Sequence, residues 1–125
     1  MRAAALLRLY SERLHEANAS AEVACISVEG GAEPSNRLLM RLSGQGLNIR
    51  MPSRCAVREL SFVDAISGAK AVQVFVTSVS LPEPGRAVVE GGYQYGPLAG
   101  HGMAYTLEFQ LGRWVVTHEH PTWIS

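Results

Sequence analysis

The C-terminal half of the sequence constrains the fold most, because from residue 70 onward it consists almost entirely of strand-forming stretches separated by turn residues. We expect strands over residues 70–81, 86–95, 103–110 and 113–120. Pro82-Glu83-Pro84-Gly85 and Leu111-Gly112 are typical of tight turns, and a glycine-rich loop over 96–102 joins the two hairpins. The pattern predicts four hairpin-linked antiparallel strands.

The two-residue loop predicted at Leu111-Gly112 sets the register of the last hairpin. One face then carries the pairs Phe109–Trp114, Leu107–Val116, Tyr105–His118 and Met103–His120. The first hairpin places Val76–Gly91, Val74–Tyr93 and Val72–Tyr95 on the same face. We expect this apolar and aromatic face to be the buried face of the sheet.

The N-terminal half predicts two helices and several short strands. Residues 3–18 form a helix candidate, since Leu6, Tyr10, Leu14 and Ala17 recur at helical spacing. Glu33-Pro34-Ser35 is typical of a second helix start, with Leu38, Leu39 and Leu42 on its buried side. Further strands are expected over 22–28, 47–51 and 57–63. With no linker or repeat visible, residues 1–125 are treated as one domain.

The predicted first helix and the predicted sheet carry the two long apolar surfaces of the chain, and each surface must be buried away from water. We therefore expect contacts of Leu6, Tyr10 and Leu14 with Val74, Leu107, Trp114 and Val116. The fold class is α+β, with the N-terminal helix packed on a curved antiparallel sheet that ends in a β-meander. This architecture resembles the cystatin-like and NTF2-like cone folds.

Several short motifs resemble a family of small uncharacterised bacterial proteins. They are Gly92-Tyr93-Gln94-Tyr95-Gly96-Pro97-Leu98, Gly102-Met103-Ala104-Tyr105-Thr106-Leu107, Gly112-Arg113-Trp114-Val115-Val116 and the terminal Trp123-Ile124-Ser125. Val28-Glu29-Gly30-Gly31, Pro34-Ser35 and Pro52-Ser53-Arg54-Cys55 resemble the N-terminal half of that family. The resemblance spans about a hundred residues and implies no activity.

Composition excludes several functional classes. Eleven basic and eleven acidic side chains balance among 125 residues, of which 47% are hydrophobic. These values favour neither disorder nor a nucleic-acid-binding protein. Arg8, Glu12 and Arg13 interrupt the N-terminal apolar stretch, so neither a membrane span nor a secretory signal is expected. The expected location is cytoplasmic, or periplasmic or secreted if a leader has been removed.

Cys25 and Cys55 are thirty residues apart, with neither a CxxC pair nor a histidine at zinc-finger spacing. We expect two buried thiols. The alternative is a disulfide, which would argue for a periplasmic or secreted protein.

His118 and His120 alternate with Glu119, which puts two imidazoles on one face of a strand. A zinc site needs a third ligand, from His101 or an acid elsewhere, and we predict no metal and no cofactor. The alternatives are a polar pocket end and half-exposed histidines at a sheet edge.

Tyr93, Tyr95 and Tyr105 share the expected inner face with the histidines. Histidine–tyrosine hydrogen bonds within the core would satisfy their hydroxyls, whereas a pocket would use them for a ligand. The candidate binding set is therefore Tyr93, Tyr95, His101, Tyr105, His118 and His120, with the 96–102 loop as its rim. Asp64 is interpreted as a turn residue.

These features predict a binding domain for an apolar small molecule or a protein partner, with a homodimer left open. The alternative is a small NTF2-like enzyme, an isomerase or hydratase, in which His118 is the general base. The glycine-rich 96–102 segment lacks the Lys-Ser/Thr of a P-loop, and no serine has the GxSxG context.

Overall fold

The computed structural model describes residues 1–12, 23–46, 48–97 and 99–124. The helices are α1 (Arg2–Glu12) and α2 (Asn36–Ser43), and short 3-10 turns lie at Glu29–Gly31 and Pro52–Arg54. The strands are β1 (Val23–Ser27), β2 (Ile49–Arg50), β3 (Cys55–Arg58), β4 (Ser61–Asp64), β5 (Ala71–Glu83), β6 (Arg86–Gly96), β7 (Ala99–Gln110) and β8 (Arg113–Ile124).

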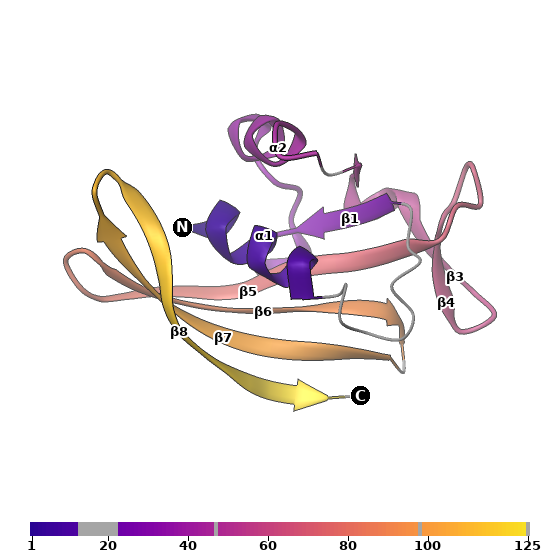
Figure 1. Ribbon diagram of the computed structural model, residues 1–125. Helices are drawn as coiled ribbons and strands as arrows, with labels where there is room; N and C mark the ends of the chain where they lie inside the picture. Colours follow the sequence, from indigo (N-terminus) through magenta and orange to yellow (C-terminus); the bar gives the residue numbers. More distant parts are fainter. Residues whose placement is uncertain (13–22, 47, 98, 125) are drawn as a thin grey trace.

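Six of the described strands form one open, mostly antiparallel sheet in the order β2-β1-β5-β6-β7-β8, and β3 pairs with β4 (Figure 1). The mixed α and β class and the four long antiparallel strands are confirmed. The prediction of an antiparallel sheet is incomplete, because β1 runs parallel to both β2 and β5. Helix α2 lies on the crossover between β1 and β2, which parallel neighbours require.

Both helices cover the same face of the sheet (Figure 1). Leu6 and Leu9 of α1 are fully buried in the main core, and Leu42 anchors α2 there. Leu6 and Tyr10 belong to one cluster with Val74, Leu107, Trp114 and Val116, as predicted. Leu14 and Ala17 lie outside the described residues. Ser35 caps α2, since its hydroxyl oxygen accepts a hydrogen bond from the Leu38 N–H at 3.2 Å.

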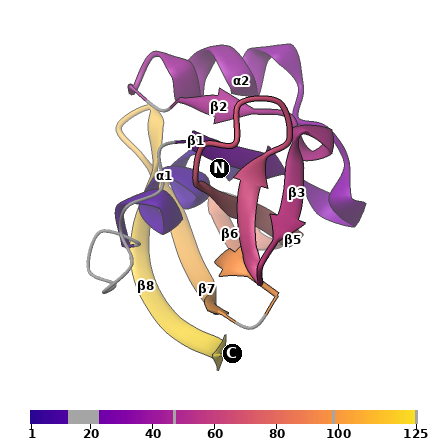
Figure 2. The same cartoon turned by 90° about the vertical axis from the view of Figure 1, so that its right-hand side faces the viewer.

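The β3–β4 hairpin covers the other face of the sheet at its β1 end (Figure 2). A second, smaller core forms there from Val23, Cys25, Phe62 and Ala71. Cys25 and Cys55 form a disulfide with their Cα atoms 6.2 Å apart. The expectation of two free thiols is therefore wrong, and the alternative is the one observed. The bond ties the hairpin to β1.

Two segments differ from the sequence prediction. Residues 57–63 are not one strand, because Glu59 and Leu60 both adopt positive φ and reverse the chain between β3 and β4. The 96–102 loop is mostly strand, since β6 continues to Gly96 and β7 begins at Ala99. A side chain at Gly100 would collide with the Tyr93 carbonyl, so this glycine permits close strand packing instead of a loop.

The turn at Leu111-Gly112 is the predicted two-residue hairpin loop. Both residues have positive φ, 51° and 81°, which is typical of a type I′ turn. Phe109 lies opposite Trp114 as predicted, with their ring centroids 5.5 Å apart. The turn predicted over the four residues 82–85 is shorter in the structure, because β5 continues to Glu83 and this residue pairs with Arg86.

Leu111 holds its left-handed conformation without any buried contact, because its side chain is fully exposed. A β-carbon in this region costs about 1–2 kcal/mol, which asparagine partly relieves. We expect Leu111→Asn to raise the free energy of unfolding by about 1 kcal/mol in urea melts. Leu81→Asn, an exposed leucine with ordinary φ, is the control. A Leu111→Asn variant no more stable than the parent would contradict the strained turn.

The Cys25–Cys55 disulfide closes a loop across a separation of 30 residues. Loop-closure entropy predicts that replacing both cysteines by alanine lowers the free energy of unfolding by about 3–4 kcal/mol. Urea melts with and without reductant provide the measurement, because reductant should destabilise the parent and leave the double variant unchanged. A parent with the same midpoint under both conditions would rule out the bond.

Candidate functional site

One extra residue in β8 moves the two histidines off the face on which the sequence places them. The β7–β8 ladder follows the predicted register as far as Leu107–Val116, and the next pair is Thr106–His118. Thr117 is therefore a β-bulge, which inverts the side chains that follow. His118 and His120 lie exposed on the face opposite the helices, so the predicted pairs Tyr105–His118 and Met103–His120 are wrong.

The same bulge turns Glu119 toward the helices. Glu119 lies opposite Tyr105, and its carboxylate accepts two hydrogen bonds from the Arg8 guanidinium of α1, at 3.0 and 3.2 Å. This bidentate pair connects the first helix to the outermost strand. Ala104, which would face Glu119 in an unbroken ladder, lies opposite His120.

The tyrosines and His101 do form a group on the helix-covered face. Tyr93 is almost fully buried and lies opposite His101, and their rings are parallel with centroids 5.6 Å apart. The Tyr95 ring meets Tyr93 edge-on at 6.0 Å. Tyr105 is fully buried on the same face. A ligand-binding role for these four residues stays a prediction, whereas His118 and His120 are separated from them by the sheet.

The described part of the chain contains neither a metal-binding cluster nor a membrane-spanning helix. No three histidine, cysteine, aspartate or glutamate side chains gather there in a way that could hold a metal ion. No described helix is long and apolar enough to cross a membrane.

Asp64 ends β4 and begins a turn, as predicted, but it is also the centre of a buried ionic cluster. Its carboxylate accepts hydrogen bonds from Arg54 at 2.9–3.1 Å, from Arg50 at 3.1 Å and from the Ile66 N–H at 3.0 Å. The Ile66 N–H, followed by the two guanidinium groups, holds the pKa of Asp64 well below its usual range despite burial. A carboxylate held ionised in this way fixes β2 and β4 and is unsuited to proton transfer.

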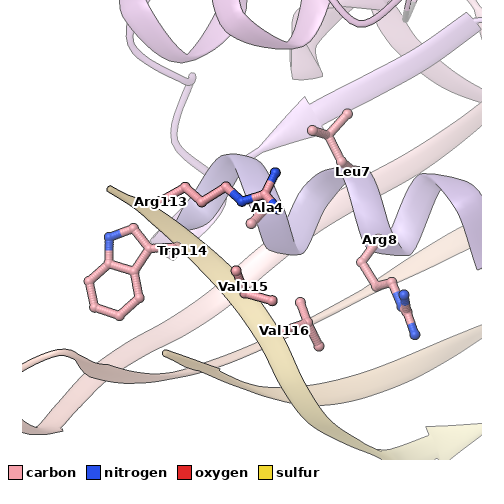
Figure 3. Close-up of a pocket in the computed structure, with 7 residues that line it drawn as sticks. All are labelled: Ala4, Leu7, Arg8, Arg113, Trp114, Val115 and Val116. Carbon is pink, nitrogen blue, oxygen red and sulfur yellow. The ribbon is translucent and has the colours of Figure 1, made fainter. Parts of the chain in front are cut away.

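An open groove lies between α1 and β8, with a volume of about 420 Å³. Figure 3 shows its lining: Ala4, Leu7 and Arg8 from the helix, and Arg113, Trp114, Val115 and Val116 from the strand. Four consecutive strand residues can line one groove only where it follows the edge of the strand, because alternate side chains point to opposite faces. The groove therefore exposes the backbone edge of β8.

The groove combines apolar walls with positive charge. Leu7, Trp114 and Val116 pack against the main core and supply the apolar surface. Arg113 is exposed on the strand, and Arg8 is held by Glu119. Nothing in the sequence predicts this site, because its apolar residues have the pattern of ordinary core positions and only the fold brings them beside Arg113.

Comparisons with protein-family models, with curated proteins and with solved structures found no match to this chain. The chemistry of the site therefore rests on its own geometry.

The Asp64 cluster predicts a pH-dependent stability. Asp64→Asn removes the charge but keeps the shape, so it should destabilise the protein at about pH 7. The folded pKa lies below the ordinary 3.8, so the ionic contribution is complete above about pH 4 and is lost as the pH falls. Urea melts should therefore show the gap between parent and variant narrowing toward about pH 3. Glu59→Gln is the exposed control, and a gap that does not change with pH would contradict the assignment.

Proposed function

We propose that the protein is a non-catalytic binding domain that takes an extended segment of a partner protein into the α1–β8 groove. The segment pairs with β8 as an additional strand and lies alongside α1. The single observation that carries the proposal is the groove along the strand edge, between the helix and residues 113–116 (Figure 3). Strand addition beside a helix is a recurring mode of peptide recognition.

The edge of β8 can offer hydrogen bonds to such a segment. Among the strands that the structure describes, β8 is paired only with β7. In a two-residue hairpin the residues flanking the turn, Gln110 and Arg113, exchange both hydrogen bonds with each other. The N–H and C=O groups of Trp114 and Val116 therefore point away from β7, toward the groove.

The first half of β8 lacks the features that protect exposed strand edges. Bulges at Thr117 and Thr122, together with Pro121, interrupt the second half of the strand. Bulges and proline are devices that block edge pairing. Residues 113–116 contain neither, which leaves the edge available where the groove is.

The lining indicates the chemistry of the segment. Apolar side chains of the segment would contact Leu7 and Val116 in the groove. An acidic side chain would pair with Arg113, because no described carboxylate forms an ion pair with this guanidinium. We therefore expect an extended segment that alternates apolar and acidic residues.

The enzyme alternative has no support from the geometry. It requires His118 beside a tyrosine, whereas His118 is exposed on the face opposite Tyr105. Asp64 is fully engaged by its two arginines. The binding domain is therefore the function that we retain.

The disulfide also bears on the compartment. Structural disulfides persist in oxidising compartments and are rare in the cytosol. The Cys25–Cys55 bond therefore favours a periplasmic or secreted protein over the cytoplasmic location expected from the sequence.

Val116→Pro tests the proposal directly. Proline removes the Val116 N–H, which points away from β7, so the β7–β8 ladder should stay intact. Short peptides selected against the parent protein from a random display library should bind Val116→Pro and Arg113→Glu at least about tenfold more weakly, measured by calorimetry. Val116→Thr keeps the N–H and the branched shape, and should bind like the parent.

Three outcomes would contradict the proposal. Peptides that bind Val116→Pro as tightly as the parent would place the site elsewhere. A fluorescent probe of apolar surface, the anionic dye 1-anilinonaphthalene-8-sulfonate, that binds the groove while no peptide is selected would indicate a small-molecule site. A homodimer abolished by Val116→Pro would show that a second copy of this chain occupies the edge.

A further inference from the structure

Four residues form a straight row across the face of the sheet opposite the helices. Phe75 of β5 lies opposite Gly92 of β6, Gly92 opposite Gly102 of β7, and Gly102 opposite Trp123 of β8. Adjacent strands lie about 4.8 Å apart, so β5 and β8 are separated by about 14 Å in this row. The two aromatic side chains stand at its ends and the two glycines lie between them.

The glycines let both rings lie flat against the sheet. A Cβ atom at Gly92 would lie 2.5 Å from the His101 carbonyl oxygen of β7, 2.9 Å from Cζ2 of Trp123 and 3.0 Å from Cζ of Phe75. A Cβ atom at Gly102 would collide with Nε1 of the same indole. The rings therefore occupy the space that side chains would otherwise fill, and they meet over Gly92.

The two rings share one orientation. Their planes differ by 7° and their centroids are 6.3 Å apart. Trp123 is 36% exposed and Phe75 is half-buried, so the pair is accessible to solvent. We call this pair, with Gly92 and Gly102 beneath it, the aromatic platform.

Hydrogen-bonding side chains lie in the neighbouring rows. On one side Gln73 lies opposite Gln94, and the Gln94 side chain lies over Gly100. On the other side Glu90 and His120 lie in the row of Ala104. From β5 to β8 these two rows contain no lysine or arginine, and farther along the first row Arg50 of β2 is paired with Asp64.

We propose that the aromatic platform binds a neutral carbohydrate, with the face of a sugar ring stacked on Trp123 and Phe75. The electron-rich face of an aromatic ring attracts the weakly positive C–H groups of a pyranose. Glutamine amides can donate hydrogen bonds to its hydroxyls and accept hydrogen bonds from them, and a carboxylate can accept from them. A single-stranded nucleic acid would also stack on the rings, but its phosphates require cations, and from β5 to β8 the flanking rows have no lysine or arginine.

This site is independent of the α1–β8 groove. It lies on the opposite face of the sheet and includes none of the groove residues. The second bulge of β8, at Thr122, brings Trp123 opposite Gly102 and so completes the row. A carbohydrate-binding face is also consistent with the oxidising compartment that the disulfide favours.

The experiment uses Trp123 as its own reporter. The chain has two tryptophans, so in a Trp114→Phe background Trp123 is the sole one. The probes are cellohexaose, chitohexaose, maltohexaose and laminarihexaose, with oligothymidylate as the nucleic-acid probe. We expect at least one oligosaccharide to shift Trp123 emission to shorter wavelength in a saturable way, with a Kd on the order of 1 mM or below.

Variants assign the binding to the platform. Trp123→Leu covers the glycines but has no aromatic face, and should weaken binding of that sugar at least about tenfold by calorimetry. Gln94→Ala leaves both rings in place and should weaken binding of the same oligosaccharide several-fold. This variant keeps the test valid if Trp123→Leu does not fold. Val88→Ala, on the same face of β6 away from the rings, should leave the affinity unchanged.

The proposal fails if none of the four oligosaccharides changes Trp123 emission, because the rings then serve only to cover the glycines. It also fails if the sugar binds Trp123→Leu and Gln94→Ala as tightly as the parent, or if oligothymidylate alone binds the platform.

Discussion

The bulge at Thr117 is the local feature on which the arrangement of β8 depends. One unpaired residue inverts every side chain after it, so Glu119 turns toward α1 and His118 turns away. The Arg8–Glu119 pair then connects the outermost strand to the first helix beside the groove. A second bulge at Thr122 keeps Trp123 on the outer face, where it reaches the glycines of β6 and β7. The aromatic platform therefore depends on two extra residues that interrupt one ladder, and the Arg8–Glu119 pair beside the groove depends on the first of them.

The parts of the fold that could be predicted are those with local chemical signals. Leu111-Gly112 fixed the last hairpin because a glycine tolerates positive φ, and the alternating apolar residues beside it set the pairs Phe109–Trp114 and Leu107–Val116. The signals for the start of α2, at Glu33-Pro34-Ser35, and for the apolar stripe of α1 were equally local. No such signal marks Thr117, because a bulge is decided by the energy of the whole ladder and not by one residue type. The register prediction therefore held up to the bulge and failed after it.

Two further features needed the tertiary structure. Cys25 and Cys55 are joined because the β3–β4 hairpin folds over β1, and nothing in the spacing of two cysteines predicts that. Gly100 and Gly102 read as loop residues in the sequence, whereas they lie within β7 and are glycine because Tyr93 and Trp123 approach them closely. His118 and His120 predicted a site because imidazoles can take part in chemistry. The groove is formed mainly by ordinary apolar residues and a strand edge, which have no sequence motif.

The account depends on the register of β7 with β8 after Leu107, and cross-strand nuclear Overhauser effects in isotope-labelled protein measure that register directly. We predict contacts between Thr106 and His118, between Ala104 and His120, and between Gly102 and Trp123. Contacts of Tyr105 with His118 and of Met103 with His120 would instead mean an unbroken ladder. That result would return the histidines to the helix-covered face, turn Glu119 away from Arg8 and contradict the aromatic platform.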